Sequence, residues 1–365
     1  MTVPRSPNDA HRKTRRVLAW YRAKGHARPT INMEKILLAH GSGGTLMHKL
    51  IDSLFIKELG NKILNERTDS AILKVGGKRI AFTTDSYVVD PIFFPGGDIG
   101  SLAVHGTVND LAVCGARPLF ISLALIIEEG LDRDMLEKIT RSIKNAAKGA
   151  GVDIVTGDTK VVEKGSCDKI FINTSGIGEV YYKGLATDAI KPGDSVIVSG
   201  NIGEHAISVL SKREGIAFTS KVSSDSAPLN RLIARALKVS RKVKFMRDPT
   251  RGGVATTLNE ICQDRNFGIA LDEEDLPVGE GVKDACELLG FDPLYLACEG
   301  RCLMIAAGED AKRIVSAMRK DASGRDAKAI GHITKDNRGK VYLNTVSGGK
   351  RIVGMLTGEQ LPRIC

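Results

Sequence analysis

Apolar residues recur along the first half of the chain with the spacings that mark helices and strands. Helical spacing runs from Leu46 to Leu59 and from Ile99 to Cys114, and charged and apolar residues alternate as in an amphipathic helix from Asp132 to Lys148. Shorter apolar runs between turn residues predict strands. These strands are expected at Arg79–Thr84, Leu119–Ile127, Val152–Thr156 and Ile170–Ser175.

The second half repeats this mixture. Helices are predicted at Gly203–Lys212, Ala227–Leu237, Gly253–Gln263 and Ala311–Arg319. Strands are predicted at Ser195–Ser199, Ile269–Leu271, Cys302–Ala306 and Ala329–Ile333. Because helices and strands are interspersed in both halves, we predict an α+β fold with a mixed sheet packed against helices in each half.

A strong turn at 191–194, Lys-Pro-Gly-Asp, separates the two halves. A chain of 365 residues is also long enough for two domains. We therefore predict a first domain at 33–188, a second at 189–345, and a mobile tail at 346–365 that ends in Cys365. Residues 1–32 are set apart as a basic N-terminal extension.

The charge of the chain is concentrated in that extension. The formal net charge is +10, but residues 1–32 hold eight basic residues and one acidic residue, which leaves 45 basic against 42 acidic residues elsewhere. An Arg-rich arm can bind nucleic acid or a membrane surface, or can target the protein. We favour a third interpretation, in which Met33 is the natural start. The nearly neutral remainder argues against a nucleic-acid partner.

The composition fits a protein of the cytoplasm. Seven cysteines, an odd number without a CxxC pair, indicate a reducing compartment rather than a disulfide framework. The longest apolar run, 119–127, is far too short to span a membrane. With 5% aromatic residues the chain offers no stacking platform for single-stranded nucleic acid.

Four aspartates stand at predicted element ends beside small residues: Asp69, Asp85, Asp110 and Asp158. One such aspartate is ordinarily a helix cap or a turn former. Four together suit Mg²⁺, which takes oxygen ligands and typically binds through carboxylates and substrate phosphates. Asn109 adds a neutral oxygen beside Asp110, and Lys160 adds a positive charge beside Asp158. The set predicts a site for a magnesium nucleotide.

Two glycine-rich turns lead into predicted helices and can supply backbone N–H groups to phosphates. The first contains Gly43 and Gly44, and the second begins at Arg251. Neither is a Walker A loop, and no GxGxxG is present. Phosphate contact by Arg251 and its pairing with Asp248 to hold the turn both remain open.

Six motifs together resemble the HypE family of hydrogenase maturation factors, within the PurM-like superfamily of ATP-using enzymes. They are GSGG from 41, TTDS from 83, VNDLAVCGA from 108, TGDTK from 156, DPTRGG from 248, and the terminal PRIC. The resemblance covers 33–365. NDLA and GDT are shared across the superfamily, whereas PRIC joined to DPTRGG and GDTK is specific. The resemblance implies a two-domain PurM-like fold, a homodimer paired through its N-terminal sheets, and ATP with Mg²⁺ in a cleft.

The resemblance also implies an activity. A HypF-like carbamoyltransferase loads a carbamoyl group onto Cys365, and this ATP-dependent enzyme dehydrates it to a thiocyanate. The cyanide then passes to an iron held by a HypC–HypD-like complex for [NiFe]-hydrogenase. The candidate catalytic residues are Cys365, Lys160 and Glu299, although Glu299 as an ordinary solvated carboxylate stays open. The candidate nucleotide-binding residues are Gly43, Gly44, Asp69, Asp85, Asn109, Asp110, Asp158, Thr159 and Arg251, and the four aspartates are also the candidate metal ligands.

Other functions stay open at this point. A selenophosphate synthetase or an aminoimidazole-ribonucleotide synthetase belongs to the same superfamily, but neither use explains Cys365, and the first glycine-rich loop has no cysteine to hold selenium. A non-catalytic maturation scaffold would bind a partner without turning over ATP. A nucleic-acid binder would act through residues 1–32.

Overall fold

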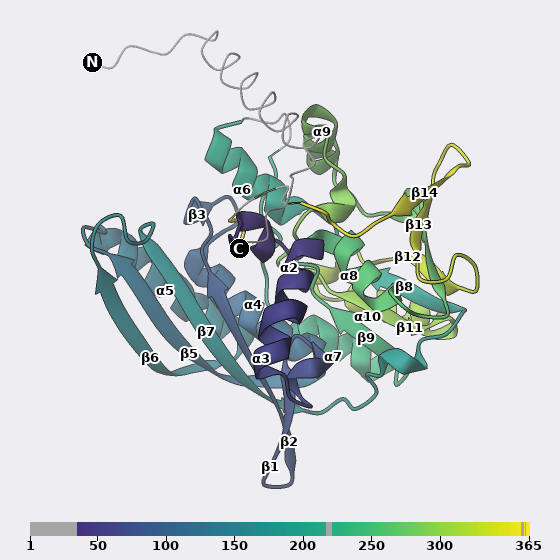
Figure 1. Ribbon diagram of the computed structural model, residues 1–365, viewed down its shortest axis with the longest axis horizontal. Coiled ribbons are helices and arrows are strands. Elements are labelled where there is room, and N and C mark those ends of the chain that lie inside the picture. The colour runs from purple at the N-terminus through teal and green to yellow at the C-terminus, as the bar shows by residue number, and fades with distance from the viewer. Residues whose placement is uncertain (1–34, 217–220, 359–360, 362) are drawn as a thin grey trace.

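The chain forms two sheets with helices packed against them (Figure 1). The computed structural model describes residues 35–216, 221–358, 361 and 363–365, so the predicted basic extension at 1–32 lies outside the described residues. A five-stranded sheet belongs to the first half and a seven-stranded sheet to the second. This arrangement confirms the predicted α+β class.

The first half begins with a helical segment and continues into the five-stranded sheet. The segment comprises η1 (Leu38–Gly41), α2 (Thr45–Leu50), the π-helical turn η2 (Ile51–Ile56), α3 (Lys57–Leu59) and η3 (Leu64–Glu66). The remaining elements are β1 (Ala71–Val75), β2 (Lys78–Tyr87), β3 (Phe93–Phe94), β4 (Gly97–Asp98), α4 (Ile99–Val113), β5 (Ala116–Glu128), α5 (Arg133–Ala150), β6 (Asp153–Val162) and β7 (Ile170–Val180).

The five-stranded sheet has one covered face and one open face. Its strand order is β1-β2-β7-β5-β6, and α4 and α5 pack on one side. Along β7 the buried residues alternate with partly exposed ones, as expected for a sheet that is covered on one side. The other face carries large apolar side chains that are about 40% exposed, namely Phe82, Phe120, Ile126 and Ile177. The parallel strand β6 forms the outer edge.

The second half contains the seven-stranded sheet, in the order β14-β13-β10-β12-β8-β11-β9. Its strands are β8 (Asp194–Val198), β9 (Val243–Arg247), β10 (Gly268–Asp272), β11 (Leu303–Ala307), β12 (Lys328–Thr334), β13 (Val341–Asn344) and β14 (Lys350–Val353). Its helices are α6 (Glu204–Glu214), α7 (Asn230–Val239), α8 (Gly253–Cys262), α9 (Glu280–Leu289) and α10 (Ala311–Met318), and short 3₁₀ turns include η4 (Thr187–Ala189) and η6 (Pro293–Tyr295).

This second sheet is buried on both faces. Along β11, Leu303 and Ile305 pack into a core with α8, whereas Met304 and Ala306 pack into a second core with α7 and α10. Every residue of β11 is therefore buried. A two-sided sheet requires such a continuous apolar run rather than an alternating one.

The two halves are joined by a packed and hydrogen-bonded junction. Ala112 and Val113 at the end of α4 lie in the same core as α7. The hydroxyl of Tyr182 donates to the carbonyl oxygen of Val243 (2.8 Å) and accepts from its N–H (3.0 Å). The junction fixes the end of α4 against β9, and the candidate site lies there.

The structure contains each of the predicted helices and strands, and it adds elements that were not predicted. The additions are β1, the two-stranded pair of β3 and β4, β9, β13, β14, α9 and the short 3₁₀ turns. Gly76 and Gly77, with φ of +55° and +77°, make the tight hairpin turn between β1 and β2. The prediction that the tail starts at 346 is wrong, because Lys350–Val353 pair with β13 as β14. No helix among the described residues is long and apolar enough to cross a bilayer.

Candidate active site

Three aspartates from distant parts of the chain meet where the halves join. Asp69 precedes β1, Asp110 lies on α4, and Asp248 follows β9. A carboxylate oxygen of each lies within 4.8 Å of the others. Asp85, near the end of β2, is close enough for its charge to act on Asp110 and Asp248. We call these four residues the acidic cluster.

Neighbouring side chains hold the acidic cluster in place. The hydroxyl of Thr83 donates to Asp110 Oδ2 at 2.7 Å. Arg247 Nε lies 3.0 Å from Asp69 Oδ1, and the same guanidinium also pairs with Glu260. His48 of α2 lies 2.9 Å from Glu260, so the helical segment before the first sheet is tied to the same network. Arg247 therefore offsets part of the negative charge.

Burial and the remaining negative charge raise the pKa values of carboxyl groups in the acidic cluster. Burial, and then the charge of Asp85, raises the pKa of Asp110 well above its usual range. Burial, followed by the charges of Asp69 and Asp85, raises the pKa of Asp248 to about 8. Crowded carboxylate oxygens with raised pKa values are the donor set that suits a hard divalent cation, whose charge would favour their ionised forms. The residues therefore fit Mg²⁺.

The two predicted glycine turns lie against each other. Gly43 has φ of +81°, and a Cβ atom there would lie 2.6 Å from Arg251 Cβ. A Cβ atom at Gly44 would lie 2.3 Å from the carbonyl oxygen of Leu356, which also accepts from the N–H of Thr45. Both positions need glycine because the backbone approach leaves no room for a side chain.

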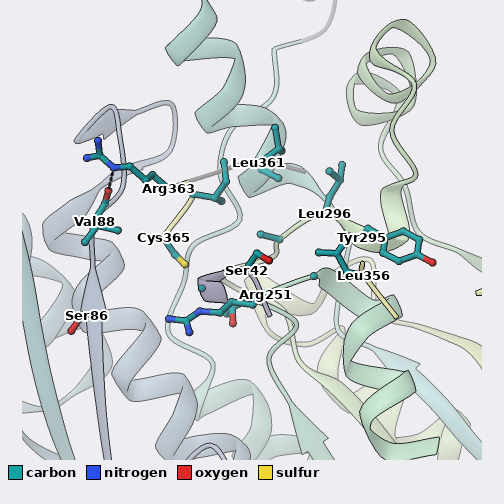
Figure 2. Close-up of a pocket in the computed structure, with 16 residues that line it drawn as sticks. Ser42, Ser86, Val88, Arg251, Tyr295, Leu296, Leu356, Leu361, Arg363 and Cys365 are labelled. Atoms are coloured by element: carbon teal, nitrogen blue, oxygen red, sulfur yellow. Dashed lines mark hydrogen bonds between the residues drawn. The ribbon is translucent and has the colours of Figure 1, made fainter. Parts of the chain in front are cut away.

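A cavity of about 150 Å³ contains the end of the chain (Figure 2). Ser42, Ser86, Arg251 and Cys365 are among its lining residues, and the sulfur of Cys365 lies beside the Arg251 side chain. Burial, and then the charge of Glu299, raises the pKa of Cys365 to about 11, although Arg251 opposes the shift. The unmodified thiol is therefore protonated at neutral pH.

Glu299 is a buried acid close to this thiol. It is 2% exposed, and its Oε1 has no hydrogen-bond partner among the described residues. Its backbone N–H donates to Asp225 Oδ1 at 3.2 Å. Burial, followed by the charges of Asp248 and Asp225, raises the pKa of the Glu299 carboxyl well above its ordinary value. It is therefore not an ordinary solvated carboxylate, and it is suited to proton transfer.

A larger cavity of about 630 Å³ borders the acidic cluster at Asp69. Arg247 and other charged residues line it together with the apolar side chains of Phe245 and Met246. At the other cavity, the charge of Asp85 acts on Cys365. The acidic cluster is therefore close to both cavities, and the size of the larger one is typical of a small-molecule site.

Several predicted site residues lie elsewhere in the single chain. Asp158, Thr159 and Lys160 are exposed on the outer strand β6, where Lys160 Nζ lies 3.1 Å from Asp158. Asp158 and Thr159 line a separate open hollow. The prediction that these residues join the other aspartates is wrong for one chain, because β6 is the sheet edge remote in pairing order from β2.

Asn109 also differs from the prediction. Its amide nitrogen donates to the carbonyl oxygens of Ala227 and Glu299, each at 3.1 Å, and its oxygen accepts from the N–H of Leu229 at 2.8 Å. The buried side chain therefore crosslinks loops of the second half to α4 and has no group left for a nucleotide.

Asp248, Arg247 and Thr83 belong to the site but were not predicted there. Asp248 opens the DPTRGG motif, and its pairing with Arg251 was one of two open alternatives. Arg247 ends β9, a strand that was not predicted. Thr83 belongs to the TTDS motif, of which only Asp85 was predicted as a site residue. The run of Arg247 and Asp248, shortly before the double glycine at Gly252, is the signal that could have identified two of them.

Comparison with known proteins identifies related chains. Residues 67–180 match the N-terminal domain of AIR synthase related proteins, and residues 191–344 match the C-terminal domain of that family. The carbamoyl dehydratase HypE of Cupriavidus necator is 48% identical over 93% of this chain and 98% of its own length. The carbamoyl dehydratase HypE of Bradyrhizobium diazoefficiens is 50% identical over 90% of this chain and 95% of its own.

Solved structures show the same similarity. A HypE crystal structure in complex with ATP has a TM-score of 0.76 at 47% identity, covering 91% of this chain and all of the other. A chain in a crystal structure of a HypE–HypF complex has a TM-score of 0.79 at 47% identity, covering 84% of this chain and 99% of the other.

Proposed function

Because the chain belongs to the HypE family of AIR synthase related proteins, we propose that it is an ATP-dependent carbamoyl dehydratase that acts on its own C-terminal cysteine. Its product is a thiocyanate that supplies cyanide to the iron of [NiFe]-hydrogenase. One observation carries the proposal for this chain. The thiol of Cys365 lies in a cavity with Arg251, close to the buried carboxyl of Glu299 and beside the acidic cluster.

The chemistry requires an activated oxygen. A carbamoyl group on the Cys365 sulfur cannot lose hydroxide unaided. Transfer of the γ-phosphoryl group of ATP to the carbamoyl oxygen gives an iminophosphate and ADP. Cleavage of the C–O bond then releases phosphate and leaves S–C≡N. Two N–H protons are lost over the two steps, and the carbamoyl oxygen leaves in the phosphate.

Glu299 is the proposed acceptor of those protons. Its raised pKa makes the ionised form a stronger base than an ordinary carboxylate. The neighbouring Arg251 favours that ionised form. Arg251 is also placed to stabilise negative charge as it develops on the transferred phosphoryl group.

The acidic cluster is the proposed metal site. Asp69, Asp110 and Asp248 would hold Mg²⁺, with Asp85 close by. Bound there, Mg²⁺ would neutralise charge on the phosphates during transfer.

The two cavities suggest how ATP lies. The base and sugar would occupy the larger cavity, against Phe245 and Met246. The phosphates would then cross the acidic cluster, with the γ-phosphate directed toward Cys365. The glycine turns at Gly43 and at Arg251 would face the phosphates with backbone N–H groups. This orientation is supported by the contact of Asp69 with the larger cavity and by the effect of the Asp85 charge on Cys365.

We also propose a homodimer that pairs through the first sheet. The open sheet face has exposed apolar residues, and the edge strand β6 adds Ile154, Val155 and Val161. A monomer seldom leaves so much apolar sheet surface uncovered. If two copies pair through β6, Asp158, Thr159 and Lys160 of one copy could reach the candidate active site of the other.

Three partners follow from the proposed reaction. A HypF-like carbamoyltransferase would load Cys365, and the HypE relative solved in a complex with HypF supports this partner. A HypC–HypD-like iron carrier would receive the cyanide. All seven cysteines are unpaired, which fits our placement of the protein in the reducing cytoplasm.

Intact mass measurement tests the function directly. After incubation with the carbamoyltransferase, its substrates and ATP, the protein should gain a carbamoyl group and then lose water, both on the C-terminal peptide. A variant that ends at Ile364 should bind ATP and show neither change. Thiocyanate formation by that variant would refute the proposal.

The alternatives give other results in the same experiment. A scaffold would bind its partners without hydrolysing ATP. A selenophosphate or aminoimidazole-ribonucleotide synthetase would turn over ATP with its own substrate whether or not Cys365 is present.

A further inference from the structure

The last three residues of the chain are held through their main-chain oxygens. The N–H of Val88 donates to a terminal carboxylate oxygen of Cys365 at 3.2 Å. His205 Nε2 lies 2.9 Å from the carbonyl oxygen of Ile364. The carbonyl oxygen of Arg363 accepts from Arg213 Nη2 at 2.6 Å. The body of the protein therefore binds this part of the tail as a peptide in a defined register.

Side chains add two further anchors. Arg363 donates to the carbonyl oxygen of Val88 at 2.9 Å, as Figure 2 shows, and pairs with Asp168 at 2.6 Å. Ile364 is 5% exposed and belongs to the core of the first half. Cys365 lines the cavity at the end of this anchored segment, and its orientation depends on the carbonyl group directly before it.

His205 bonds that carbonyl group, and its own position is fixed from two sides. It lies in the first turn of α6 and is fully buried. Its Nδ1 lies 2.8 Å from the hydroxyl of Ser224, and that hydroxyl oxygen already accepts from the N–H of Ser226 at 3.1 Å. The edge-to-face ring of Phe94 has its centroid 5.3 Å away.

These contacts select one tautomer of His205. The carbonyl oxygen of Ile364 can only accept, so the hydrogen of the neutral ring resides on Nε2 and is donated to Ile364. Nδ1 then accepts from the hydroxyl of Ser224. Burial lowers the pKa of His205, which favours the neutral ring that this arrangement requires.

We propose that His205 is a positioning residue for the dehydration step, which orients the Cys365 sulfur by holding the Ile364 carbonyl group. The inference rests on the proposed function. His205 acts through the main chain and exchanges no proton with the substrate. His205 contacts the tail only in this docked position, so we expect loading by the carbamoyltransferase not to depend on it.

The test uses the full-length protein, loaded with carbamoyl by its transferase, in a single turnover with ATP. Loss of water at the C-terminal peptide is followed by mass spectrometry at several ATP concentrations. His205→Leu removes the donor, and His205→Gln restores an N–H group. His105→Leu is the matched control, because the partly buried His105 bonds Ser226 of the same loop (3.0 Å) without contacting the tail.

We expect His205→Leu to lower the maximal rate of water loss about 10- to 100-fold. Carbamoyl loading and the ATP concentration at half-maximal rate should stay unchanged. His205→Gln should recover most of the rate, and His105→Leu should match the unmodified protein. Faster alkylation of Cys365 in His205→Leu would accompany the loss, because the tail is held less tightly.

Three results would overturn the assignment: an unchanged rate in His205→Leu, no recovery in His205→Gln, or an equal loss in His105→Leu. If His205→Leu does not fold, Ser224→Ala replaces it, since the ring then loses the hydroxyl that fixes its position. A normal rate in that variant also refutes the inference. Failure of the unmodified protein to lose water would instead refute the proposed function.

Discussion

Arg247 Nε lies 3.0 Å from Asp69 Oδ1, and this pair joins the two halves of the chain at the acidic cluster. Asp69 belongs to the first half and Arg247 to the second. Both side chains are about four-fifths buried. The pair therefore holds the two halves together and also offsets negative charge at the site.

Removal of Arg247 should destabilise the protein. Arg247→Met leaves Asp69 partly buried without its cation, and we expect a loss of about 2–3 kcal/mol in the free energy of unfolding in urea. Arg117→Met is the control, because its pair with Glu179 is largely exposed and should change stability by less than about 1 kcal/mol. Equal losses in both variants would contradict the role given to Arg247.

The stability of the metal-free protein should fall as pH rises. The folded-state pKa of Asp248 is raised to about 8, so its contribution is fully present below the unfolded pKa, about 4, and is lost as pH rises through 8. This group alone gives a slope of up to about 1.4 kcal/mol per pH unit in that window. Urea titrations from pH 5 to 9, in the presence of a metal chelator, measure how the free energy of unfolding changes with pH.

Asp248→Asn should flatten that dependence and stabilise the metal-free protein at pH 8 to 9. The same substitution should weaken the stabilisation that added Mg²⁺ gives the native protein, because a ligand is lost. Asp336→Asn, an exposed surface change, should alter neither quantity. An Asp248→Asn variant with the native pH profile would show that this carboxyl is ordinary.

Gly43→Ala should impair both stability and turnover. The residue has φ of +81°, and the new methyl group would clash with Arg251. We expect a loss of about 1–3 kcal/mol in stability and reduced ATP turnover. Gly76→Ala is the control that measures backbone strain without a steric clash. Gly76 also has a positive φ, but no atom lies close enough to meet a new methyl group. This substitution should cost about 1–2 kcal/mol with normal turnover.

Glu299→Gln should block dehydration without blocking loading. The substitution keeps the shape of a buried side chain and removes the proton acceptor. We expect water loss to slow about 10²- to 10⁴-fold, while the carbamoylated protein accumulates. Mass measurement after addition of ATP distinguishes the two species. A variant that produced thiocyanate at the native rate would assign the base to another residue.

The sequence was most informative where patterns are long or local. The helix at Ile99–Val113 and the strand at Ala116–Glu128 were predicted because each has many periodic residues. Asp69, Asp85 and Asp110 were predicted because small residues surround each at an element end. The strands β13 and β14 are four residues each, too short for such a pattern.

Other parts of the site left no readable signal. Docking of the tail depends largely on main-chain oxygens, which every residue has, and the partners of the Arg363 side chain lie 195 to 275 residues away in the sequence. Asp158 and Lys160 were grouped with the other charges by residue type, whereas strand order separates them in a single chain. Asn109 was assigned by its type as well, and its partners 118 to 190 residues away could not be read from its neighbours.

The last strand of the second sheet limits where the terminal sulfur can travel. β14 ends at Val353, twelve residues before Cys365. A fully extended chain of that length spans about 40 Å. Any enzyme that loads or unloads the thiol must therefore bring its reactive centre inside a sphere of that radius around Val353, so the length of this tether constrains how its partners can dock.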